Sequence, residues 1–132
     1  MDYVTNSSSS SYIICFARIA DEEKAKAIIK KHNLAILDVE GVNAEKNWCG
    51  ELGADYAGAI IWNADAIMDA HPNDKYIIIE DSNEAVEYWD EETDDYEISY
   101  DYDFVMNDAI EEITEANGFA DIEIAEGEGR NG

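Results

Sequence analysis

Carboxylates are the residues of this chain whose number and spacing could support chemistry, and they are concentrated in its second half. From Glu80 to Glu128 the sequence holds 20 acidic residues and no lysine or arginine. Within this region the stretch "YEISYDYDF" alternates aromatic or apolar residues with polar ones, which is the period of a half-exposed strand. Alternate residues of a strand project from one face about 6.6 to 6.8 Å apart, inside the Debye length of roughly 8 Å at physiological salt, so these carboxylates repel one another.

Such an acidic ladder predicts a surface that imitates the backbone of a nucleic acid and docks into a basic groove. B-DNA carries a phosphate about every 3.4 Å per strand, so the ladder has about half that density, and neighbouring acids could supply the rest. The alternative is a solvated acidic face, as in proteins adapted to salt. The residues that we expect to contact a partner are Glu87, Tyr88, Trp89, Asp90, Glu91, Glu92, Asp94, Asp95, Glu97, Tyr100, Asp101 and Asp103. Tyrosine and tryptophan can anchor an interface, although core packing is the alternative for most of these aromatic residues.

Metal binding is a rival use of the same carboxylates. The stretch from Asp90 to Asp101 has oxygen ligands at several positions of a calcium loop. Its sixth residue, however, is Asp95 where the loop requires glycine, and its twelfth is aspartate instead of glutamate. We therefore expect no dedicated metal site and no cofactor.

Nucleophilic catalysis has few candidates. Cys15 lies in an apolar run and is expected to be a buried thiol, whereas Cys49 lies in a glycine-rich turn where its pKa could be lowered. His32 and His71 are the histidines that could serve as its base, and His32 is placed as a helix-end residue. No phosphate-binding loop, nucleophile elbow or zinc-binding pair of histidines is present, so we expect no catalytic residues and no enzymatic activity.

The totals describe one acidic domain with an asymmetric charge. The chain has 132 residues, an apolar fraction of 46% and a net charge of -24. Residues 1–46 hold seven acids and six bases, while residues 47–132 hold 25 acids with Lys75 and Arg130 as the bases. This polarisation favours an interaction surface over a uniform coat. With two cysteines, no apolar run of membrane-spanning length and no basic secretion signal, a cytoplasmic protein with reduced thiols is expected.

The elements that must position these residues follow from periodicity. Strands are predicted over 11–19, 34–40, 75–80, 96–104 and 119–125, and helices over 21–33, 57–68, 81–89 and 104–117. The prediction is a single α+β domain, 11–126, with one sheet of about five strands, three or four helices and a βαβ-like N-terminal half. Residues 1–10 are expected to form a flexible serine-rich lead-in and residues 127–132 a flexible tail.

The opening "DYVTNSSSSSYII", Asp2 to Ile14, resembles the N-terminus of small uncharacterised proteins of low-GC Gram-positive bacteria and their phages. The resemblance implies a phage or mobile-element setting and carries no active site. In size and charge the chain is similar to acidic phage anti-defence proteins, such as DNA mimics and anti-CRISPRs. The expected function is a non-enzymatic inhibitor that occludes the basic nucleic-acid-binding surface of a partner, such as a host defence nuclease, without binding nucleic acid or membrane itself. An immunity protein against a basic toxin and a divalent-cation-binding protein are the alternatives.

Overall fold

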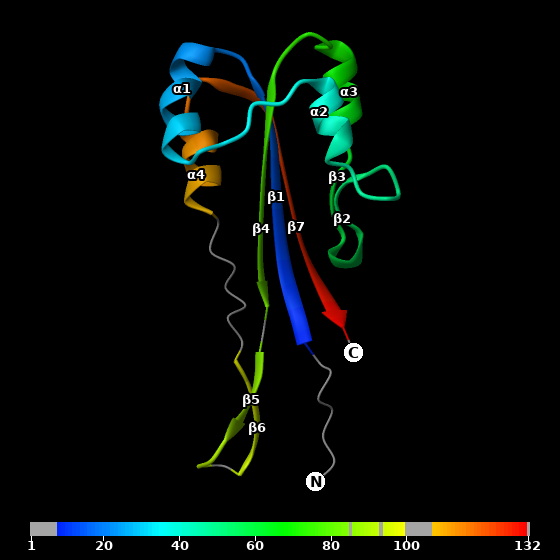
Figure 1. Cartoon of the computed structure of the whole chain (residues 1–132), viewed down its shortest axis with the longest axis vertical. Helices are drawn as coiled ribbons and strands as arrows, with labels where there is room; N and C mark the ends of the chain where they lie inside the picture. Colours follow the sequence, from blue (N-terminus) through cyan, green and yellow to red (C-terminus); the bar gives the residue numbers. More distant parts are fainter. Residues whose placement is uncertain (1–7, 85, 93, 100–106, 132) are drawn as a thin grey trace.

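The computed structural model describes residues 8–84, 86–92, 94–99 and 107–131, and it confirms the α+β class. Its elements, shown in Figure 1, are β1 (Ser8–Ile19), α1 (Glu22–Lys31), α2 (Val39–Ala44), β2 (Leu52–Ala54), the 3-10 helix η1 (Asp55–Ala57), β3 (Ala59–Ile61), α3 (Ala64–Ala70), β4 (Tyr76–Glu84), β5 (Val86–Asp90), β6 (Asp95–Ser99), α4 (Asp108–Glu115) and β7 (Phe119–Asn131). The strands divide among a three-stranded sheet and two two-stranded hairpins, where one sheet was expected.

The central sheet has the order β4-β1-β7, and both pairings of β1 are antiparallel. The predicted βαβ-like opening is therefore wrong. Residues 34–40 form no strand of their own; a single bridge joins Leu37 to Tyr76 through backbone hydrogen bonds of 2.8 and 2.7 Å. Asp38 then ends the extended stretch because its carboxylate accepts the Gly41 N–H at 2.8 Å and caps α2.

Two hydrophobic clusters lie on opposite faces of this sheet, because successive residues of β1 point to opposite sides. Ile13, Cys15 and Ala17 are fully buried on the face covered by α1 and α4. Ile14 and Phe16 are fully buried on the face covered by α2, α3, β2 and β3 (Figure 1). Asp21 caps α1 by accepting the N–H groups of residues 23 and 24, and the first turn of the helix carries Glu22 and Glu23, which complement its dipole.

A bulge interrupts β7 and changes which of its residues face the core. Asp121 has φ 52, and the pairing with β1 shifts between Phe16 and Arg18. Strict alternation along the predicted strand 119–125 would place Ala120 on the core side with Ile122 and Ile124. In the structure Ile122 and Ile124 do pack against the cluster on the face covered by α1 and α4. Phe119 is buried there in place of Ala120, because the extra residue of the bulge shifts the alternation before Ile122.

The predicted helix over 57–68 divides into three elements. Gly58, with φ 71, ends η1, and Ile60 and Ile61 then belong to β3 before α3 begins at Ala64. Gly53, with φ 129, is required in β2 because a β-carbon there would lie 1.9 Å from the Ala59 carbonyl oxygen. α3 ends at Ala70, two residues before Pro72, which cannot continue a helix.

The ends of the described chain are also strands. β1 begins at Ser8 and pairs with β7 as far as Asn131, so parts of the predicted lead-in and tail belong to the central sheet. α4 begins at Asp108 with Asn107 as its cap, and residues 104–106 of the predicted helix lie outside the described chain.

Candidate functional site

Nine of the expected contact residues lie on a β-hairpin that we call the acidic hairpin, residues 86–99, and six of the nine are in its two strands. β5 and β6 pair antiparallel, from Val86 opposite Ser99 to Asp90 opposite Asp95. The predicted helix over 81–89 is therefore wrong. Asp81, the first residue of that predicted helix, lies in β4, where its carboxylate accepts the Ser82 N–H at 2.9 Å and the Asn107 side-chain amide at 3.0 Å.

The register of the hairpin places its acidic positions together. Positions that are paired, or that lie two residues apart on one strand, share a face of the ribbon. By this rule Asp90, Asp95 and Glu97 share one face, with Asp90 and Asp95 directly opposite each other. Trp89 is paired with Tyr96 on the other face. Each face also has one position of the other kind. Glu87 shares the face of Trp89 and Tyr96, and Tyr88 shares the face of Asp90 and Asp95.

The turn of the hairpin adds three more carboxylates. Glu91, Glu92 and Asp94 are exposed, and Asp94 adopts a left-handed backbone with φ 53, which aspartate tolerates better than most residues. The calcium-loop alternative for residues 90–101 requires a different backbone from this hairpin over its described part. Of the expected contact residues, Tyr100, Asp101 and Asp103 lie outside the described chain.

The acidic hairpin lies at the end of the molecule opposite the four helices (Figure 1). Exposed carboxylates continue from it along the central sheet. Asp81 and Glu126 flank Ile13 in one row of paired residues, and Glu128 pairs with Ser11 in the next. The acidic surface thus includes β4 and β7 residues that the sequence did not indicate as contacts. Their strand pairing, which has no local sequence signal, brings them together.

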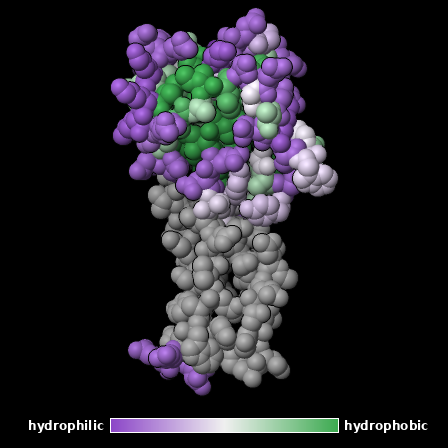
Figure 2. Space-filling view, viewed as in Figure 1, coloured by the Kyte–Doolittle hydropathy of each residue, from purple (hydrophilic) through white to green (hydrophobic). Residues whose placement is uncertain are grey.

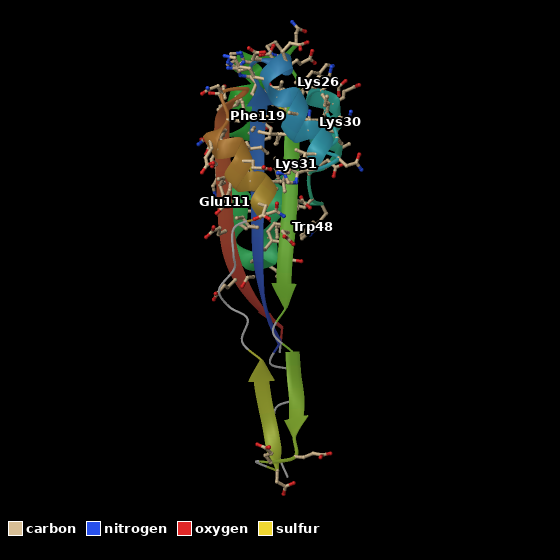
Figure 3. The ribbon with its side chains drawn as sticks, turned by 90° about the vertical axis from the view of Figure 1, so that its left-hand side faces the viewer. Lys26, Lys30, Lys31, Trp48, Glu111 and Phe119 are labelled. Carbon is tan, nitrogen blue, oxygen red and sulfur yellow. The ribbon has the colours of Figure 1, made fainter. Side chains whose placement is uncertain are left out.

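Most bases lie at the helical end, and several are already paired. Lys26, Lys30 and Lys31 project from α1 (Figure 3). Lys31 contacts Glu112 at 2.5 Å, and His32, which ends α1, contacts the second oxygen of the same carboxylate. Arg130, in the last residues of β7, is the base nearest the hairpin along the sheet. The charge asymmetry of the sequence is thus also an asymmetry in space.

A second cluster of charged groups lies at the end of the central sheet that is farther from the acidic hairpin. Arg18 donates to Asp121 at 2.8 Å and to Asp74 at 3.1 Å, and His71 Nδ1 lies 3.4 Å from Asp74. The Tyr76 hydroxyl donates to the His71 carbonyl at 2.5 Å. These contacts join β1, the segment after α3 and the β7 bulge. The cluster therefore supports the strained backbone of Asp121.

The thiols lack the surroundings of a nucleophile. Burial raises the pKa of the Cys15 thiol to about 12. A hydrogen bond with Asp55 raises the pKa of the exposed Cys49 thiol, which is the opposite of activation. His71 is paired with Asp74 rather than with Cys49. In the part of the chain that is described, no group of three or more His, Cys, Asp or Glu residues is placed to hold a metal.

Exposed aromatic residues outside the hairpin were missed by sequence reasoning. Trp48 is 93% exposed, Trp62 73% and Tyr56 59%. The sequence signals that could have indicated the two tryptophans are the position of Trp48 two residues before Gly50 and that of Trp62 directly before Asn63, since glycine and asparagine favour turns and loops. Trp62 was overlooked because residues 57–68 were assigned to one helix. Large exposed aromatic side chains on a structured frame are typical of interaction surfaces.

A further apolar area lies near the helical end, where Figure 2 shows hydrophobic side chains surrounded by hydrophilic ones. A hollow of about 230 Å³ beside α1 is lined by Ile29 and Ile36 together with Glu22, Glu23 and Lys26. Its charged residues have both signs, so it indicates no preference for a basic partner.

Comparison with known proteins adds no relative. No family model, curated protein or solved structure matches this chain. None of the helices in the described residues is long and apolar enough to cross a membrane.

Proposed function

We propose that the protein is a non-enzymatic inhibitor whose acidic hairpin binds the basic, nucleic-acid-binding surface of a partner protein. One observation carries the proposal: a hairpin rich in carboxylates lies at one end of the molecule, and most bases lie at the other. Such a separation orients the molecule toward a positive surface before contact and raises the association rate.

The hairpin register supplies the second argument. Asp90 and Asp95 are direct partners, and like charges directly opposite on a hairpin are destabilising. No base within residues 76–129 offsets this repulsion. A cationic partner surface would offset it, so the cost in the free protein becomes a gain in the complex.

Inhibition would proceed by occlusion. The hairpin and the adjoining carboxylates of β4 and β7 occupy a groove in which DNA or RNA would otherwise bind, without copying the helix geometry. The anti-defence setting, with a host nuclease as the target, rests on the resemblance of the N-terminal opening and is part of the same proposal.

The test is a competition experiment. The immobilised protein captures partners from a bacterial lysate, and double-stranded DNA is then added. The proposal expects that a basic nucleic-acid-binding protein is retained, that DNA displaces it, and that neutralising Glu91, Glu92 and Asp94 weakens capture. A gel shift showing direct binding of DNA or RNA to the protein at physiological salt would contradict the proposal, since two polyanions repel.

A further inference from the structure

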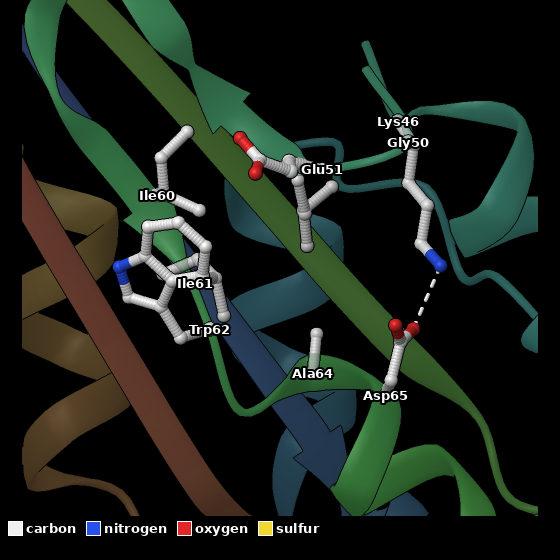
Figure 4. Close-up of a pocket in the computed structure, with 9 residues that line it drawn as sticks. Lys46, Gly50, Glu51, Ile60, Ile61, Trp62, Ala64 and Asp65 are labelled. Atoms are coloured by element: carbon white, nitrogen blue, oxygen red, sulfur yellow. Dashed lines mark hydrogen bonds and ion pairs between the residues drawn. The ribbon is translucent and has the colours of Figure 1, made fainter. Parts of the chain in front are cut away.

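A pocket on the face of the sheet opposite α1 is formed by the loop after α2, β3 and the start of α3 (Figure 4). We call it the Trp62 pocket. It has a volume of about 190 Å³, and its base is formed by side chains that are at most 7% exposed, namely Leu52, Ile60, Ile61 and Ala64. The base is part of the packed structure, so the pocket does not depend on a mobile loop for its shape.

Trp62 forms one wall of the pocket and is held by its neighbours. Ile61 before it is paired with Leu52 in the β2–β3 hairpin, and Asn63 after it donates to Glu123 of β7 at 3.2 Å. Gly127 allows this hairpin to approach β7, because a β-carbon there would lie 1.8 Å from the Ala57 carbonyl oxygen. The indole is thus 73% exposed on a fixed backbone. An aromatic anchor that is already positioned loses little entropy on binding.

The opposite side of the pocket is charged. Lys46 contacts Asp65 at 2.7 Å, and the side chain of Lys46 is only 18% exposed, so its charge is already matched. Glu51 lies above the pocket between this pair and Trp62 (Figure 4). A hydrogen bond with the Asp55 carboxyl raises the pKa of Glu51. The charged residues that line the pocket are two acids, Glu51 and Asp65, and one base, Lys46, so their balance favours a cation.

The combination of an aromatic wall, an apolar base and a carboxylate matches one side chain best. A guanidinium is planar, stacks on aromatic rings and presents a fork of N–H donors to carboxylates, whereas an ammonium does so less well. We propose that the Trp62 pocket receives an arginine side chain of the basic partner, stacked on Trp62 and hydrogen-bonded to Glu51. This inference rests on the proposed function, since it takes the partner to be basic.

The experiment uses hexa-arginine as the probe and hexa-lysine as its charge-matched control, at about 0.15 M salt to screen non-specific attraction. The full chain is labelled with ¹⁵N, and the indole N–H resonances of the tryptophans are followed during titration. Hexa-arginine is expected to shift the Trp62 resonance at concentrations where hexa-lysine does not. W62A should weaken hexa-arginine binding by at least about fivefold and hexa-lysine binding by less than about twofold. E51Q should also reduce the preference for arginine.

W48A is the matched control, because Trp48 is 93% exposed and does not line the pocket. It should retain the preference for arginine. Equal losses from W62A and W48A, or a Trp62 resonance that hexa-arginine leaves unmoved, would overturn the inference. The hairpin variant E91Q/E92Q/D94N separates the two proposals: it should bind the captured partner about 3-fold to 150-fold more weakly yet keep the response of Trp62. If its affinity for the partner is unchanged, the hairpin proposal fails, while the arginine pocket is judged on the W62A result.

Discussion

Neutralising the turn of the acidic hairpin is the most direct perturbation of the proposed binding surface. Glu91→Gln, Glu92→Gln and Asp94→Asn together remove three charges while keeping size and hydrogen-bonding groups, and asparagine suits the left-handed backbone at 94. Net charge changes from -24 to -21. The fold should be retained, because these side chains are exposed.

The expected loss of affinity follows from the exposure of these side chains. An exposed ion pair contributes about 0.2 to 1 kcal/mol, so three pairs with a basic partner contribute about 0.6 to 3 kcal/mol. This corresponds to a loss of affinity of about 3-fold to 150-fold, most of it in the association rate. Surface plasmon resonance against the captured partner at two salt concentrations measures both quantities, and far-UV circular dichroism checks folding.

The control variant carries the same change in net charge at the helical end. Glu40, Glu45 and Asp69 are exposed and lie in or beside α2 and α3, at the end of the molecule away from the hairpin (Figure 1), and the control replaces them as Glu40→Gln, Glu45→Gln and Asp69→Asn. Charges farther away than the Debye length of roughly 8 Å are largely screened, so this variant should lose less than about twofold in affinity. Equal losses from both variants would refute the role of the hairpin and leave only total charge. If neither variant lost affinity for the partner, the hairpin would be a solvated acidic surface with no role in binding.

Three further predictions concern the frame and the titrating groups. Gly127→Ala should lower the free energy of unfolding by roughly 1 to 3 kcal/mol, because its β-carbon would lie 1.8 Å from the Ala57 carbonyl oxygen. Gly50→Ala has open space around it, so it should lower the free energy of unfolding only through the strain of its left-handed backbone, by about 1 to 2 kcal/mol. Chemical denaturation of both variants measures the two losses. Lys31 and His32 hold the pKa of the Glu112 carboxyl below its usual value. The contribution of this carboxyl to stability should therefore be present above its pKa in the unfolded chain and lost as the pH falls through its lowered pKa in the folded protein. An acid titration of wild type and E112Q by NMR should show this loss in the wild type alone, and identical curves would contradict it. Cys49 should react slowly with iodoacetamide at neutral pH and faster after Asp55→Asn, because Asp55 raises the pKa of the Cys49 thiol. A reaction rate unchanged by the substitution would show that Asp55 does not raise this pKa.

Local signals predicted the elements whose stabilising contacts are themselves local. The helix after β1 was expected over 21–33, and α1 has acids in its first turn and lysines in its last, an arrangement that complements the helix dipole. The apolar run from Ser11 to Ile19 was expected to be a buried strand, and β1 is the centre of the sheet. The assignments failed where the partner lies far away in sequence. Asp81 and Glu84 match a helix-start pattern, yet β4 continues through them because it pairs with Ser10 to Ile13.

The amino-acid sequence by itself determined the large excess of acids over bases and their separation along the chain, because both follow from composition and residue order alone. It also determined that the acidic and aromatic residues expected to contact a partner are concentrated in one segment, because their order along the chain is read directly from the sequence. Only the tertiary structure decided that Asp90 faces Asp95, that acids of β4 and β7 adjoin the hairpin, and that Trp62 stands exposed beside a pocket. The physical reason is the same in each case: strand register and side-chain exposure depend on pairing and packing between segments distant in sequence, for which single-residue propensities carry no information.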